Sequence, residues 1–131
     1  MERTRGMGYL SSEWRRFRRV IPQSGTPLAV QVDEPAGMGE VAVRDLGEGG
    51  MELQTSVGDP AWLGGPVRLR LTLPGGSIVP VQGRVRHVEA NRVGVVFEQL
   101  LAADRELVRL YVERIAGESW WSRLRRMLQG G

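Results

Sequence analysis

Four arginines close to the N-terminus are the side chains of this sequence best suited to recognise a charged ligand. They are Arg15, Arg16, Arg18 and Arg19, and the chain contains no lysine. Each guanidinium is planar and can donate two parallel hydrogen bonds to a phosphate, or to the N7 and O6 acceptors of guanine. The cluster, with its spacing Arg15-x-x-x-Arg19, comes just before the first predicted strand and indicates a site for a phosphorylated purine.

A second segment with suitable chemistry is Asp45-Leu46-Gly47-Glu48-Gly49-Gly50. The ionised carboxylate of Asp45 can accept hydrogen bonds from the N1–H and N2–H groups of guanine together. Glycines let the backbone approach a ligand closely or adopt positive φ angles. With the arginines, this segment predicts a pocket that reads phosphates and guanine edges. The candidate ligand-binding residues are Arg15, Arg16, Arg19, Asp45, Gly47 and Gly50.

The charge distribution argues against a general nucleic-acid-binding face. Residues 1–19 hold six arginines against two acidic residues, whereas residues 20–64 hold one arginine against seven acidic residues. A uniformly basic face would not contain such an acidic middle. Sites for single-stranded nucleic acid also require aromatic stacking platforms, and only Trp62 and Phe97 lie in or beside the predicted strands. We therefore expect no nucleic acid partner.

Other function classes lack the residues that they need. The chain has no cysteine and one histidine, so a Cys/His metal set is excluded, and the glycine-rich turn lacks the lysine of a P-loop. We expect neither an enzyme nor a bound metal or cofactor. No run of about 18 apolar residues and no secretory signal pattern occurs, so there should be no transmembrane segment, and we expect a cytoplasmic protein.

Short apolar segments with period-two alternation occupy the middle of the chain. Six of them are separated by turn residues at regular intervals, which predicts six antiparallel strands. The expected strands cover residues 28–32, 40–44, 51–55, 67–73, 78–88 and 93–97. A sandwich or a barrel would fit this spacing, and closure into a barrel would remove exposed edges. We therefore expect an all-β protein with a small barrel.

The period changes after residue 100. Val108, Tyr111, Val112 and Ile115 follow helical spacing, with Asp104 as the expected N-cap and Gly117 as the expected stop. The tail at residues 118–131 predicts a second, amphipathic helix. We expect three parts: a flexible N-terminal segment over residues 1–11, a barrel domain with its helix over residues 12–117, and the Trp/Arg-rich tail helix over residues 118–131.

These features together resemble the PilZ domain. The resemblance rests on Arg15-x-x-x-Arg19, then Asp45-x-Gly47-x-x-Gly50-Met51, then Gly94-Val95-Val96-Phe97 and a C-terminal helix, and it covers roughly residues 12–116. It implies a six-stranded antiparallel, Greek-key-like β-barrel that binds cyclic di-GMP through Arg-x-x-x-Arg and Asp/Asn-x-Ser-x-x-Gly.

The resemblance also implies roles for individual residues. Arg15 and Arg19 would grip guanine edges and phosphates, Asp45 would take the Watson–Crick edge of a guanine, and Gly50 would hold the turn. Gly47 departs from the family pattern, which has serine there. Loss of one hydroxyl hydrogen bond costs about 0.5–1.5 kcal/mol, whereas micromolar binding corresponds to about −8 kcal/mol. We expect a weakened site rather than an absent one.

Two functional hypotheses follow. In the first, the chain is a cyclic di-GMP receptor whose Arg-rich N-terminal segment becomes ordered on ligand binding and signals to a partner protein. In the second, it is a degenerate PilZ-like adaptor that binds a partner and no nucleotide.

Some of these residues also have simpler interpretations. The arginine cluster could be a solvated charged segment, and the segment from Asp45 to Gly50 could be only a turn that connects two strands. His87 lacks an obvious acidic partner in the sequence and is assigned a structural role. Trp120, Trp121 and Leu124 are candidate partner-binding residues. Packing of the tail on its own barrel is slightly favoured over docking on a partner protein or a membrane surface.

Overall fold

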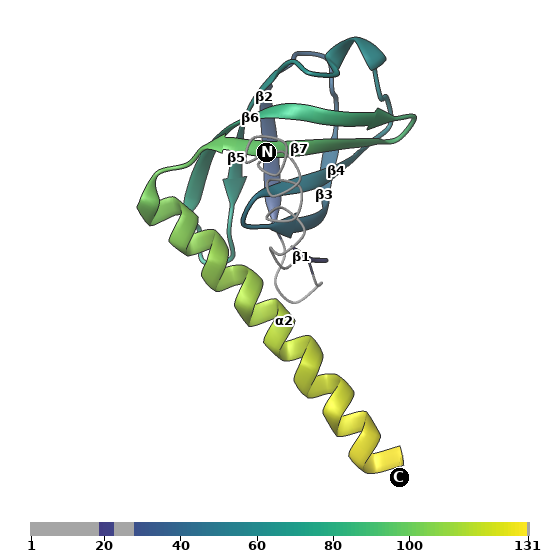
Figure 1. Ribbon diagram of the computed structural model, residues 1–131, viewed down its shortest axis with the longest axis vertical. Coiled ribbons are helices and arrows are strands. Elements are labelled where there is room, and N and C mark those ends of the chain that lie inside the picture. Colours follow the sequence, from purple (N-terminus) through teal and green to yellow (C-terminus); the bar gives the residue numbers. More distant parts are fainter. Residues whose placement is uncertain (1–18, 23–27, 131) are drawn as a thin grey trace, which may run out of the picture.

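The computed structural model describes residues 19–22 and 28–130, which form one curled β-sheet followed by a long helix (Figure 1). A short 3₁₀ turn, η1, covers Pro60–Trp62, and the helix, α2, covers Ala102–Gly130. The strands are β1 (Arg19–Val20), β2 (Ala29–Glu34), β3 (Val41–Gly47), β4 (Gly50–Thr55), β5 (Pro66–Thr72), β6 (Ile78–Glu89) and β7 (Arg92–Gln99).

The strands form a single antiparallel sheet in the order β1-β3-β4-β7-β6-β5-β2. All six predicted strands are present, but the predicted six-stranded closed barrel is wrong in two respects. A seventh strand, β1, pairs with β3, and among the described residues no ladder joins β1 to β2, so the sheet stays open. The sequence could not indicate β1, because two residues are too few to show an alternation.

The core lies inside the curl of the sheet. On β5, Val67, Leu69 and Leu71 are buried whereas Arg68 and Arg70 are exposed, as period-two alternation requires. Residues of β4, β6 and β7 alternate in the same way. Their fully buried side chains include Met51, Leu53, Val79, Val81, Val93 and Val95. Trp62 packs against this core from η1.

Helix α2 covers one side of the curled sheet with its first half. Val108, Tyr111, Val112 and Ile115 are all buried, as predicted from their spacing, and this part of the helix contacts β1 and β3. Asp104 lies in the first helical turn and not at the expected N-cap, because the helix already begins at Ala102.

The expected helix end at Gly117 is also wrong, because α2 runs without interruption to Gly130. Glycine ends a helix when it adopts a left-handed conformation, and Gly117 is not among the glycines with positive φ. In a helix interior, glycine costs only about 1 kcal/mol relative to alanine. The tail therefore continues the same helix.

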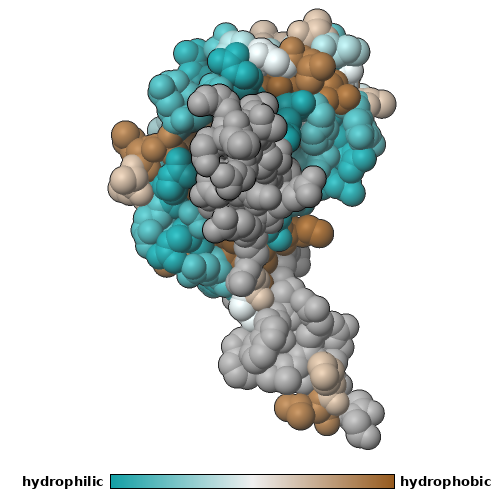
Figure 2. All heavy atoms as spheres, viewed as in Figure 1, coloured by the Kyte–Doolittle hydropathy of each residue, from teal (hydrophilic) through white to brown (hydrophobic). Residues whose placement is uncertain are grey.

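The second half of α2 extends away from the sheet (Figure 1), and Met127 and Leu128 are exposed near its end (Figure 2). No helix in the described part of the chain is long and apolar enough to cross a membrane. The expected flexible segment at residues 1–11 lies outside the described residues.

Candidate functional site

An ion pair between Arg19 and Asp45 forms the centre of the candidate site. The Nε and Nη2 atoms of Arg19 donate to Oδ1 of Asp45 at 3.0 and 2.5 Å. The side chains are 26% and 23% exposed, so both are partly shielded from water and still reachable. β1 and β3 are neighbouring strands in which Arg19 lies opposite Gly47. The sheet thus brings Arg19 of the first predicted motif beside Asp45 of the second.

A β-bulge turns Asp45 to the outer face of the sheet. The register of β3 against β4 shifts between Val43 and Asp45, so that Arg44 is the additional residue. Val43 packs against the core and Leu46 is fully buried, while Arg44 and Asp45 between them both face outward. Strict alternation would have directed Asp45 into the core. The bulge therefore makes this carboxylate available beside Arg19.

The glycine-rich segment is a tight hairpin, and most of it lies in strands. Gly47 ends β3 and Gly50 begins β4, which leaves only Glu48 and Gly49 in the loop. The amide of Phe97 donates to the carbonyl of Gly49 at 2.9 Å and fixes the loop against β7. The candidate residues Gly47 and Gly50 therefore have positions set by the sheet, next to the ion pair.

A polar row crosses the outer face of the sheet beyond Asp45. Asp45 lies opposite Glu52 on β4, Glu52 lies opposite Gly94 on β7, and Gly94 lies opposite His87 on β6. Oε2 of Glu52 lies 3.5 Å from Nε2 of His87 and 3.5 Å from Nε of Arg92. The expectation that His87 has no acidic partner is wrong, because the sheet supplies Glu52 from a strand 35 residues away.

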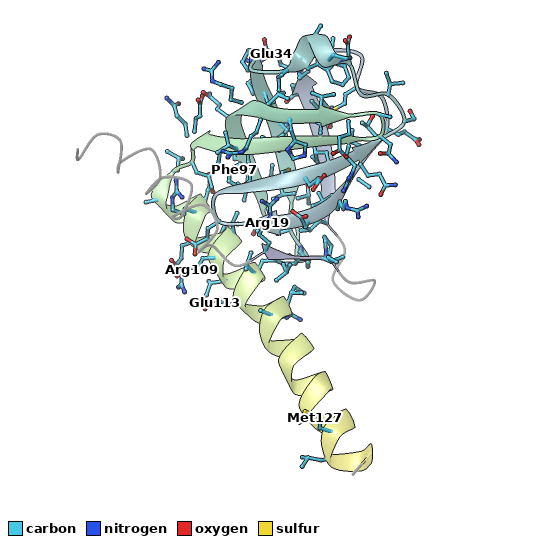
Figure 3. All side chains as sticks on the ribbon, turned by 45° about the vertical axis from the view of Figure 1, so that its right-hand side comes forward. Arg19, Glu34, Phe97, Arg109, Glu113 and Met127 are labelled. Carbon is cyan, nitrogen blue, oxygen red and sulfur yellow. The ribbon has the colours of Figure 1, made fainter. Side chains whose placement is uncertain are left out.

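The structure gives no side-chain positions for the other predicted site residues. Arg15 and Arg16 lie outside the described residues. Trp120, Trp121 and Leu124 lie in the distal half of α2, and the structure describes their backbone but not their side chains. Figure 3 places Arg19 at the edge of the sheet past which α2 runs, with the distal half of the helix extending away from it.

The part of the chain that the structure describes contains no group of three metal-ligating His, Asp or Glu side chains. An open hollow of about 530 Å³ lies elsewhere, beside η1 and the ends of β2 and β5, and it is lined in part by Asp33, Glu34, Trp62 and Arg68. Its lining residues include neither Arg19 nor Asp45.

Sequence reasoning missed Glu52, His87 and Gly94 as members of the site. The one available signal was Arg86-His87, two successive polar residues in a segment that otherwise alternates. Such a break predicts a bulge, but it does not say which residue the bulge turns outward.

Comparison with known proteins gives a family for this arrangement. A family model described as the PilZ domain matches residues 13–114. The structure of Bacillus subtilis Inhibitor of motility (MotI/DgrA) is similar with a TM-score of 0.65 and 19% identity, over 76% of this chain and 50% of that one. This chain therefore spans half the length of that protein.

Two further solved structures match almost their whole length. The PilZ domain with c-di-GMP of YcgR from Escherichia coli is similar with a TM-score of 0.60 and 14% identity, over 83% of this chain and 96% of that one. The Legionella uncharacterized protein Lpg0364 is similar with a TM-score of 0.52 and 15% identity, over 77% and 96%. At these identities the structures support the fold alone. No curated protein matches the sequence. Because the family model matches most of the chain, the chain belongs to the PilZ domain family.

Proposed function

We propose that this protein is a receptor for cyclic di-GMP that passes the signal to a partner protein. The observation that carries the proposal is the Arg19–Asp45 ion pair, in which two residues of separate motifs lie side by side on neighbouring strands. Family membership supports it, and so does the solved PilZ domain of YcgR, which is described with c-di-GMP. The role is one of binding rather than catalysis.

The two side chains have complementary tasks in this proposal. The guanidinium of Arg19 pairs with a phosphate or with the N7 and O6 edge of a guanine. The carboxylate of Asp45 accepts the N1–H and N2–H donors of the opposite edge. Both donors from Arg19 go to Oδ1, and no described residue is seen to donate to Oδ2. The proposal therefore assigns Oδ2 of Asp45 as an acceptor for a base.

The energies allow a ligand to replace the ion pair. A partly exposed pair contributes about 0–1 kcal/mol, because desolvation and side-chain ordering oppose the Coulomb attraction. Micromolar binding corresponds to about −8 kcal/mol, so exchanging the pair for ligand contacts costs only a small part of that. Gly47 lacks the hydroxyl of the family pattern, which weakens the site by about 0.5–1.5 kcal/mol and leaves most of it in place.

Signal transfer starts from β1 in this proposal. Arg15, Arg16 and Arg19 become neutralised by ligand phosphates, so the Arg-rich segment that precedes β1 can settle on the sheet. Helix α2 contacts both β1 and β3, and a change at Arg19 therefore reaches the helix. The partner would be recognised by the distal helix at residues 118–131, through Trp120, Trp121 and Leu124. Residues 1–11 would act as a flexible arm, and residues 12–117 as the receptor domain.

Titration calorimetry with cyclic di-GMP tests the receptor function. We expect binding heat at about 100 μM folded protein, because a micromolar site is nearly saturated at that concentration. No heat from a sample shown to be folded would reject the receptor function. Capture of a partner that does not depend on the nucleotide, lost on deletion of residues 118–131, would then favour the adaptor that binds no nucleotide.

A further inference from the structure

A β-bulge turns His87 outward, as another β-bulge does for Asp45. The register of β6 against β7 shifts between Val85 and His87, which makes Arg86 the additional residue of a second bulge. Val85 is buried and Val88 packs against the core, while Arg86 and His87 between them both face outward. Strict alternation would have directed His87 inward. Two bulges on different strands thus expose the two residues that end one row of the sheet.

The imidazole of His87 lies on the bare backbone of Gly94. A Cβ atom at position 94 would meet three atoms of the ring at distances that real Cβ atoms do not show, so only glycine leaves this place for the ring. The neighbours of Gly94, Val93 and Val95, are buried, and Gly94 itself is covered on the outer side. The ring therefore lies against the sheet, and its side chain remains 46% exposed.

Glu52 holds the ring in this position from the Asp45 side. Its Oε2 atom is 3.5 Å from Nε2 of His87, and its side chain is only 14% exposed because it lies between the ring and Arg92. Arg92 is itself held in place by Glu89, to which its Nη2 atom donates at 2.5 Å. A positioned and half-exposed aromatic ring in the same row of the sheet as Asp45 is a surface on which a purine can stack.

We propose that His87 is a stacking platform for a purine base of the bound nucleotide, with Glu52 and Gly94 as its positioning residues. The proposal rests on the proposed function, since it concerns the same ligand. Adjacent strands lie about 4.8 Å apart, so the three strand steps from Asp45 to His87 span roughly 14 Å. One purine cannot reach both ends of that span. A dinucleotide carries two bases and could place one at Asp45 and the other on His87.

A purely structural role for His87 fits these observations less well. The Glu52 contact is long at 3.5 Å, and an exposed pair of this kind contributes little to stability. The side-chain end of a core histidine would be buried, whereas this one is nearly half exposed. Bulges are also frequent beside binding sites, because they re-aim single side chains.

Calorimetry with cyclic di-GMP on five variants tests the proposal. Loss of one base–aromatic stack predicts that His87→Ala binds roughly tenfold more weakly, since stacking contributes about 1–3 kcal/mol per base. His87→Phe keeps a flat ring and should restore affinity to within about threefold of the unchanged protein. Gly94→Ala displaces the ring and should weaken binding as His87→Ala does.

Gln82→Ala is the matched control and should bind normally, because Gln82 is an exposed residue of the same strand that lies outside the row. Arg19→Ala should bind at least tenfold more weakly.

Proton NMR of the bound nucleotide supplies a readout that a structural role would not change. Ring currents from a stacked imidazole shift the H8 signal of the base upfield, and His87→Ala should remove that shift. Normal affinity of His87→Ala would overturn the proposal and leave the receptor function intact. A weakened His87→Ala that Phe does not rescue, with no upfield H8 signal in the unchanged protein, would overturn stacking as well. Absence of binding to the unchanged protein would reject both proposals together.

Discussion

Arg19 and Asp45 form an ion pair at 2.5 Å although 26 residues separate them in the chain. The pair spans the first strand of the sheet and the bulged part of β3, and it links β1 to the outer face of the sheet. In the free protein the two side chains neutralise each other. Ligand binding would replace this internal contact by two external ones.

Substitution of Arg19 by alanine should affect ligand binding far more than folding. Hydrogen bonds to charged groups contribute about 1.5–3 kcal/mol, so the loss of this side chain weakens cyclic di-GMP binding at least tenfold, from a micromolar dissociation constant to roughly 10 μM or higher. The free energy of unfolding should fall by no more than about 1 kcal/mol, because partly exposed pairs add little. Titration calorimetry and urea unfolding of the same sample measure the two effects.

Arg70→Ala is the matched control for this substitution. Arg70 also pairs with an aspartate, Asp33, at 3.0 Å on two neighbouring strands, but it lies on β5 at the other end of the sheet. We expect normal ligand affinity for this variant. Equal weakening by both substitutions would show that the net charge of the protein, and not the Arg19–Asp45 site, governs binding.

Restoring a serine at position 47 should strengthen ligand binding or leave it unchanged. Leu46 is buried, so alternation places residue 47 on the outer face with Asp45, directly opposite Arg19. We expect a hydroxyl on this residue, opposite Arg19, to reach the ion pair or a bound base. One added hydrogen bond corresponds to about 0.5–1.5 kcal/mol, or roughly two- to tenfold in the dissociation constant. Weaker binding by a Gly47→Ser protein of unchanged thermal stability would contradict this assignment of the position.

The strands that could be predicted are those with one face on the core. β5 shows why, because burial of Val67, Leu69 and Leu71 forces an alternation that the sequence displays directly. β1 could not be predicted, since a two-residue strand exists only through its pairing with β3. The length of α2 was missed for a similar reason, because Gly117 is a stop signal only in a left-handed conformation that the sequence does not specify.

About half of the candidate site could also be predicted from the sequence. Residue types alone marked Arg19 and Asp45, because their chemistry matches phosphates and guanine edges. Glu52 and His87 could not be predicted as neighbours, since their contact depends on the registers of two strand pairs and on the bulge at Arg86. A one-residue difference in register would turn His87 inward and remove the contact.

Gly117→Ala should stabilise the middle of α2. Nothing lies within 4 Å of a Cβ atom placed there, and the helix continues on both sides. Alanine stabilises a helix interior by about 0.8–1 kcal/mol relative to glycine. Amide exchange near residue 117 should therefore slow by roughly fourfold. Hydrogen exchange followed by NMR or mass spectrometry measures this. Faster exchange in the variant would indicate a left-handed Gly117 and a helix that ends there.

Loss of an apolar side chain should destabilise the protein strongly in the first half of α2 and very little in the second half. Ile115 is 2% exposed and packs in the core, so Ile115→Ala removes buried methyl groups and leaves a cavity, at a cost of about 2–5 kcal/mol. Leu128 is 74% exposed near the helix end, so Leu128→Ala should change the free energy of unfolding by less than about 0.5 kcal/mol. Urea unfolding monitored by tryptophan fluorescence compares both with the unchanged protein. A large loss of stability in Leu128→Ala would mean that the distal helix packs on its own domain, and would exclude it as the surface for a partner.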